Sequence, residues 1–85
     1  MKTIVWSKEN CPHCLQAMSL LDSHNIEYEV RKIDGVTWTR EQLLEEVPTA
    51  RSVPQIFMYG KLVGGYPELQ TYFENTNSGS TEGKL

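Results

Sequence analysis

The chain has 85 residues, of which 39% are hydrophobic and 22% charged, so we expect one folded domain with an adequate core. Its net charge of −3 argues against a nucleic-acid binder that works by neutralising phosphates. No apolar run approaches the roughly 20 residues that a membrane-spanning helix needs, and the first residues do not resemble a secretory signal. We therefore expect a cytoplasmic, monomeric protein that binds neither nucleic acid nor a membrane.

The first part of the chain predicts a strand, a helix and a second strand. Residues 2–6 are apolar and β-rich, and from Pro12 to about His24 the apolar side chains recur at helical spacing. Proline suits a first helical turn, and Asn25 can close the helix in the left-handed conformation. Residues 26–33 then alternate like a strand with one wet face, with Ile26, Tyr28 and Val30 on one side and Glu27, Glu29 and Arg31 on the other.

A second helix is predicted to begin at a capping box. Thr39 can accept a hydrogen bond from the first turn, and Gln42 can reach back to it from three residues later. Trp38 and Leu43 flank this cap as a hydrophobic staple, and Pro48 ends the helix.

A hairpin follows the second helix. Residues 53–59 predict a strand with Pro54 at its start, where a proline is tolerated. The tight connection at 60–61 and the short apolar segment 62–63 indicate a returning antiparallel strand.

The last predicted element is a helix from Tyr66 to Phe73. Residues 75–85 are polar, aperiodic and rich in Gly and Ser, so we expect a flexible tail behind a domain of residues 1–74. The order β-α-β-α-β-β-α predicts an α/β fold, with a small mixed four-stranded sheet and helices on both faces. The first crossover makes its two strands parallel, and the late hairpin adds an antiparallel pair.

The only two cysteines form the sequence Cys11-Pro12-His13-Cys14, between the first strand and the first helix. In a small protein of the reducing cytoplasm this pattern indicates thiol–disulfide redox chemistry. A structural disulfide is a weaker interpretation, because so short a loop constrains the unfolded chain little. Half of a zinc site is a further alternative, although no second cysteine pair is present to complete it.

Three separated motifs resemble the glutaredoxin family of the thioredoxin superfamily. They are the Cys-Pro-His-Cys sequence with Ser7-Lys8 before it, the segment 51–57 around Pro54, and the segment 60–65 with its double glycine. The resemblance implies a thioredoxin-like fold. The chain departs from the family at His13, where tyrosine is usual, and at Tyr66-Pro67-Glu68, where an aspartate often follows the glycines.

The position of Cys11 at the start of a helix identifies it as the attacking residue, because the helix N-terminus stabilises a thiolate. Cys14 lies one turn inward and is expected to resolve the mixed disulfide. We expect His13 to stabilise the reduced form and so to raise the reduction potential. The alternative is a histidine that faces solvent without effect.

The family resemblance also implies a glutathione site. Lys8 is expected to bind the glycyl carboxylate, and Arg51 either adds a second positive charge or is an ordinary surface residue. Val53 presents its backbone to the ligand beside a cis Pro54, and the two glycines permit a close approach. Tyr66 either packs over the γ-glutamyl group or caps the core. The remaining expected contacts are Gly64, Gly65 and Glu68.

We therefore expect a glutathione-dependent thiol–disulfide oxidoreductase of the dithiol type, with glutathione as co-substrate and no metal. Its substrates are expected to be protein disulfides and glutathione mixed disulfides, and the family resemblance implies ribonucleotide reductase among the former. One alternative is an electron donor that thioredoxin reductase recharges. Another is an iron–sulfur carrier in which glutathione supplies further ligands.

Overall fold

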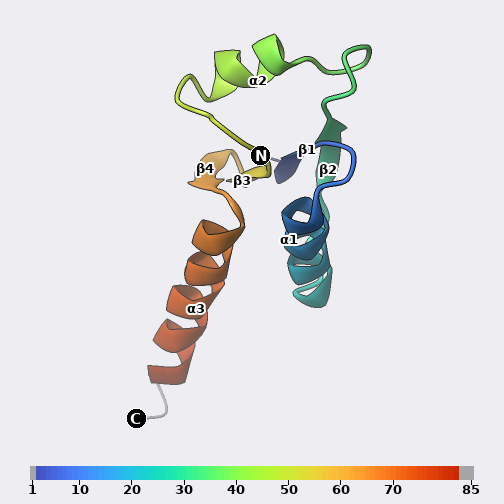
Figure 1. Cartoon of the computed structure of the whole chain (residues 1–85). Helices are drawn as coiled ribbons and strands as arrows, with labels where there is room; N and C mark the ends of the chain where they lie inside the picture. The colour runs from blue at the N-terminus through green and yellow to red at the C-terminus, as the bar shows by residue number, and fades with distance from the viewer. Residues whose placement is uncertain (1, 83–85) are drawn as a thin grey trace.

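The structure, a computed structural model, describes the backbone of residues 2–82 and the side chains of residues 2–74. The predicted order of elements is confirmed (Figure 1). The elements are β1 (Ile4–Ser7), α1 (Pro12–Ser23), β2 (Glu29–Lys32), α2 (Arg40–Glu46), β3 (Gln55–Met58), β4 (Lys61–Gly64) and α3 (Tyr66–Glu82).

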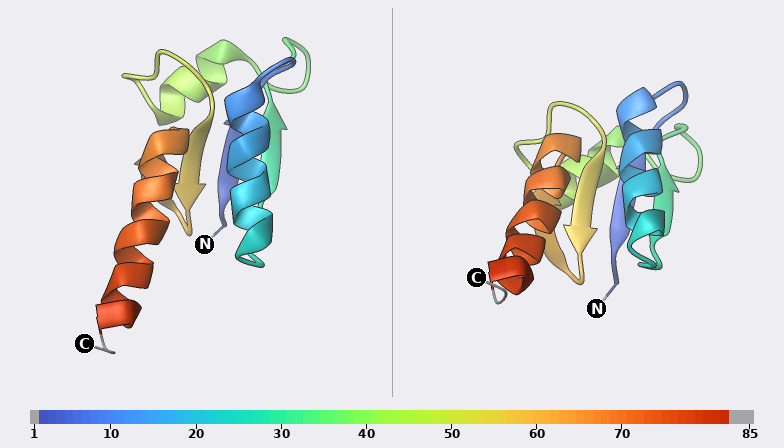
Figure 2. Two further views of the ribbon diagram at one scale, coloured as in Figure 1. Left: turned by 60° about the horizontal axis from the view of Figure 1, so that its bottom comes forward. Right: turned by 90° about the horizontal axis from the view of Figure 1, so that it is seen from below.

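The four strands form one mixed sheet in the order β2-β1-β3-β4. The predicted parallel pair of β1 with β2 and the predicted antiparallel pair of β3 with β4 are confirmed. β1 also pairs antiparallel with β3. Figure 2 shows α1 and α3 side by side on one face of this sheet and α2 behind it. The thioredoxin-like arrangement therefore places the start of α1 and the start of α3 at the same end of the molecule.

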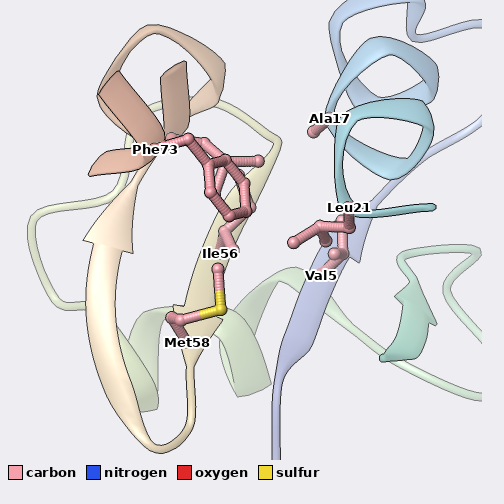
Figure 3. Close-up of a cluster of buried hydrophobic side chains, with 7 residues drawn as sticks. Val5, Ala17, Leu21, Ile56, Met58 and Phe73 are labelled. Carbon is pink, nitrogen blue, oxygen red and sulfur yellow. The ribbon is translucent and has the colours of Figure 1, made fainter. Parts of the chain in front are cut away.

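The face beneath α1 and α3 is packed with aliphatic side chains and one phenylalanine (Figure 3). Alternate strand residues point into it, because successive side chains of a strand lie on opposite faces. Ala17 and Leu21 of α1 are fully buried, and Leu69 and Phe73 of α3 complete the cluster. The strands contribute Val5, Ile56 and Met58.

The opposite face is built on Trp6, Leu43 and Val47 beneath α2. The ring of Trp38 meets that of Trp6 edge-on, with centroids 5.3 Å apart. The Arg31 guanidinium lies over both rings, 5.2 Å from the centroid of Trp6 and 4.4 Å from that of Trp38. Such cation–π contacts stabilise the guanidinium group in its place over the tryptophan rings.

The prediction for β2 was wrong in part, and Arg31 gives the reason. Arg31 was assigned to a wet face, yet it pairs in register with Trp6 and is covered by Trp38. Val30, assigned to the buried side, is 43% exposed because β2 is an edge strand. Ile26 and Tyr28, which precede the strand, do pack against the α1 and α3 cluster as predicted.

Local sequence signals determine the element ends as expected. Thr39 and Gln42 form the full capping box, in which Gln42 N–H donates to Thr39 Oγ1 at 3.2 Å and Thr39 N–H donates to Gln42 Oε1 at 2.8 Å. Asn25 adopts the predicted left-handed conformation with φ of 58°. Positive φ at both Tyr59 and Gly60 makes the tight turn that joins β3 to β4, one residue before the connection predicted at 60–61. β3 is also shorter than the strand predicted at 53–59.

Helix α3 extends beyond its predicted end at Phe73. Its backbone is helical to Glu82. The flexible tail expected at residues 75–85 stays a prediction. The part of the expected tail at residues 83–85 lies outside the described residues. No helix of the described chain is long and apolar enough to cross a membrane.

Candidate active site

Cys11 and Cys14 form a disulfide at the N-terminus of α1. Cys11 is the N-cap residue with an extended backbone, and Pro12 occupies the first helical position, where its missing N–H removes no helical bond. The Cys14 N–H donates a hydrogen bond to Cys11 Sγ at 3.2 Å. Cys11 Sγ is thus the acceptor that caps the helix, which is the position where negative charge is stabilised.

The two sulfurs differ in their access to solvent and to ligands. Cys11 is 7% exposed, whereas Cys14 is fully buried. Cys11 Sγ lies 3.8 Å from the carbonyl oxygen of Val53, and the Val53–Pro54 peptide bond is cis, as expected. An incoming disulfide can therefore reach Cys11 beside the loop that contains Val53, while Cys14 is shielded by the protein.

A groove of about 550 Å³ lies between the start of α1, the loop before β3 and the start of α3. His13 contributes from α1, and Leu62 from β4. The groove collects eight of the residues predicted from sequence, which are His13, Arg51, Val53, Pro54, Gly64, Gly65, Tyr66 and Glu68.

Lys8 lies in a neighbouring hollow of about 190 Å³ that shares residues 50–53 with the groove. Arg40 and Arg51 also line this hollow, and none of its lining residues is acidic. Within the described residues, no ion pair neutralises any of these three cations. The hollow is therefore an unpaired cationic end, suited to a carboxylate. Arg40 was missed by sequence analysis, because only the packing of α2 on the sheet brings it near Lys8.

Glu68 lines the groove from the first turn of α3. Its Oε1 accepts a hydrogen bond from the Gly65 N–H at 2.9 Å and so caps α3. A Cβ atom at Gly64, whose φ is 124°, would lie 2.9 Å from Glu68 Cγ. The first glycine is thus required both by its backbone conformation and by the side chain that crosses it.

His13 and Tyr66 face each other across the top of the groove. Their rings stack with centroids 6.1 Å apart and planes inclined by 25°. Tyr66 also packs against the buried cluster under α1 and α3, in agreement with the expectation that it caps the core. Sequence analysis named both residues but had no signal for their contact, since 53 positions separate them.

The clear pKa shifts lie outside the groove. The Arg31 side chain, followed by that of Lys2, lowers the pKa of Glu29 through hydrogen bonds. The backbone N–H groups of Val36 and Thr37 lower the pKa of Asp34. Within the described residues, no group of three or more His, Cys, Asp or Glu side chains could hold a metal ion.

The family model named glutaredoxin matches residues 3–63, which include both cysteines and the cis-proline. Glutaredoxin 3 of Escherichia coli (strain K12) is 34% identical over 65 residues, which cover 76% of this chain and 77% of that protein. Oxidised glutaredoxin 2 from Chlamydomonas reinhardtii superposes with a TM-score of 0.72 at 30% identity, covering 88% of this chain and 73% of that one. A buckwheat glutaredoxin–glutathione complex superposes with a TM-score of 0.74 at 25% identity, covering 88% and 70%.

Proposed function

The chain belongs to the glutaredoxin family and is a thiol–disulfide oxidoreductase, and from this we propose that glutathione is its electron donor and that Cys11 is the attacking residue. The observation that carries the assignment of Cys11 is its hydrogen bond from the Cys14 N–H, together with its residual accessibility of 7%, against 0% for Cys14, next to Val53. In the reduced protein the same N–H stabilises a Cys11 thiolate relative to the thiol. Cys14, which is fully buried, is the resolving residue.

The proposed cycle moves two electrons from glutathione to a protein disulfide. The Cys11 thiolate attacks one sulfur of the substrate, whose other sulfur leaves as a thiolate and takes a proton. The Cys14 thiolate then attacks Cys11 Sγ, which releases the second substrate thiol and leaves the Cys11–Cys14 disulfide. One glutathione thiolate attacks Cys11 Sγ and frees Cys14. A second attacks the bound glutathione sulfur, releasing glutathione disulfide and the Cys11 thiolate.

The charge distribution around the disulfide supports glutathione as the ligand. Lys8, Arg40 and Arg51 offer unpaired positive charge to the glycyl carboxylate. The Val53 backbone and the Gly64–Gly65 segment let an extended peptide lie along the groove, and Glu68 offers a carboxylate to the amino group of the γ-glutamyl end. The relative from buckwheat is a glutathione complex. No metal takes part in this proposal.

The wider proposal concerns substrates and setting. We propose that a monomer acts in the reducing cytoplasm, where a vicinal cysteine pair serves catalysis more often than structure. Its substrates are protein disulfides, ribonucleotide reductase among them, and glutathione mixed disulfides.

The test is turnover of a small glutathione mixed disulfide with glutathione and glutathione reductase. Cys11→Ser and Cys14→Ser form a matched pair, because each removes one sulfur from the same helix. We expect Cys11→Ser to lose activity, and we expect Cys14→Ser to keep it because deglutathionylation requires one thiol alone. A wild-type protein that is inactive here but is reduced by thioredoxin reductase contradicts the glutathione assignment. Activity that survives Cys11→Ser contradicts the assignment of Cys11.

A further inference from the structure

Each end of α1 is joined to α3 by a histidine stacked on an aromatic ring. At the start of α1, His13 stacks on Tyr66 with ring centroids 6.1 Å apart. At its end, His24 stacks on Phe73 with centroids 3.8 Å apart and planes inclined by 3°. Only the first of these pairs adjoins the disulfide, because His13 lies between Cys11 and Cys14 in the chain.

Tyr66 is a fixed support for the His13 ring. It is the first residue of α3, it packs against the buried cluster, and it follows a glycine whose N–H is held by Glu68. The His13 side chain is itself exposed and forms no hydrogen bond or ion pair among the described residues. Stacking on Tyr66 is therefore the contact that selects one orientation for a side chain otherwise free to sample several rotamers.

Orientation decides what an exposed imidazole can do for the sulfurs. A polar or charged ring that samples solvent-facing rotamers is screened by water and salt. A ring held by a fixed partner keeps its N–H groups at a constant place at the start of α1, between Cys11 and Cys14 in the chain. That arrangement stabilises the thiolate of the reduced protein relative to the disulfide, and this raises the reduction potential.

We propose that Tyr66 is a positioning residue for the redox centre, which acts by holding the His13 imidazole beside the Cys11–Cys14 pair. Tyr66 has no part in electron transfer. Its removal abolishes the influence of His13 on the reduction potential while leaving both cysteines in place. The inference rests on exchange at the Cys11–Cys14 disulfide and is independent of whether glutathione is the physiological donor.

The test is a double-mutant cycle on the equilibrium with dithiothreitol, a reductant that needs no glutathione site. Dithiothreitol gives two electrons and two protons to the Cys11–Cys14 disulfide and becomes its cyclic disulfide. The equilibrium constant is measured for the wild type, His13→Phe, Tyr66→Leu and the double variant. Phenylalanine retains a ring at position 13 but removes its N–H groups and charge.

We expect His13→Phe to lower the equilibrium constant for reduction about tenfold in the wild type, which equals about 30 mV for a two-electron couple. In the Tyr66→Leu background the same substitution should change it less than about twofold, because the coupling between contacting residues is lost. The proposal is overturned if His13→Phe changes the equilibrium constant by the same factor with Tyr66 in place and in the Tyr66→Leu background. It is also overturned if His13→Phe has no effect on the equilibrium constant of the otherwise wild-type protein.

Two controls separate positioning from general effects. Tyr66→Phe keeps the ring and should preserve the full effect of His13→Phe. His24→Phe removes the other histidine of α1 from its own stack and should leave the equilibrium constant unchanged, since His24 lies about 18 Å along a 12-residue helix from its start. A shift as large as that of His13→Phe would overturn the proposal. Should Tyr66→Leu not fold, Tyr66→Met replaces it in the same cycle with the same criteria.

Discussion

The two faces of the sheet support two different halves of the site. Among the residues whose side chains the structure describes, the cluster beneath α1 and α3 has seven buried members and supports the helix that begins at the disulfide. The cluster beneath α2 has three and lies next to the cationic hollow. The first face is mostly aliphatic, with Phe73 as the aromatic member of its buried cluster. The second is closed by Trp38 and by Arg31, whose side chain remains 21% exposed.

The difference matches what each half of the site requires. Thiol–disulfide exchange depends on sulfur positions that a close-packed helix can hold. Attraction between a cation and a carboxylate falls off slowly with distance and tolerates a looser support. We therefore expect damage to the first face to cost more stability than damage to the second, and damage to the second to be seen chiefly in substrate affinity.

The largest effect is expected from Leu21→Ala in α1. Leu21 is fully buried, so the substitution should lower the free energy of unfolding by about 2–5 kcal/mol, a large part of the 5–15 kcal/mol typical of a domain. Leu15→Ala is the matched control on the same helix, since Leu15 is 65% exposed and should change stability by about 0.5 kcal/mol or less. Urea unfolding of the two variants measures the difference in their free energies of unfolding. Equal losses of free energy would contradict the close packing expected around Leu21.

A smaller loss of stability is expected from Thr39→Ala at the start of α2. The substitution removes the Oγ1 acceptor of the Gln42 N–H and should cost about 1 kcal/mol. Thr71→Ala is its control, because the Thr71 hydroxyl donates to the Pro67 carbonyl within α3 and caps no helix N-terminus. If Thr39→Ala destabilised the protein as much as Leu21→Ala, the proposed ranking of the two faces would be refuted.

Substrate affinity should respond to Arg40→Gln. Removing one of the three cations of the hollow should raise KM for a glutathione mixed disulfide about two- to fivefold, with little change in kcat. The change is small because an exposed ion pair contributes little free energy. The effect should shrink as salt is added. Lys61→Gln on β4 is the matched loss of a positive charge outside the hollow, and a KM shift of the same size there would refute a specific role for Arg40.

Local chemistry made much of the fold predictable. The capping box at Thr39 and the left-handed Asn25 each depend on neighbours in sequence, and each is where the sequence placed it. The hairpin is also present, with its turn one residue earlier than predicted. The wrong interpretation of β2 arose from a distant contact. Arg31 follows the alternation expected of a wet face, but Trp38 folds over it from outside the strand.

The same distinction applies to the site. The disulfide and the cis-proline lie in motifs that can be recognised from sequence. The place of Arg40 in the cationic hollow depends on how α2 crosses the sheet, and the stack of His13 on Tyr66 depends on two helices meeting. Neither relation leaves a pattern in the chain, so only the structure reveals them.

The smallest expected effect is a loss of stability in acid that is confined to the α2 face. The pKa of Asp34 and that of Glu29 are lowered in the folded protein, so both carboxylates contribute stability that is complete above about pH 5 and is lost as the pH falls through the lowered pKa values. Asp34 accepts hydrogen bonds from two N–H groups of the loop before α2, each at 2.8 Å, and Glu29 holds Arg31 at 2.8 Å.

Because both tryptophans lie on this face, their fluorescence reports its loosening directly. Acid titration should therefore change tryptophan fluorescence before the amide hydrogens of α1 lose their protection from exchange. Asp34→Asn should flatten the part of the acid dependence that this carboxylate contributes, while Glu27→Gln, at an exposed position before β2, should leave that part intact. Simultaneous loss of both signals would mean that the two faces unfold as one unit, and the division of stability between them would then have to be abandoned.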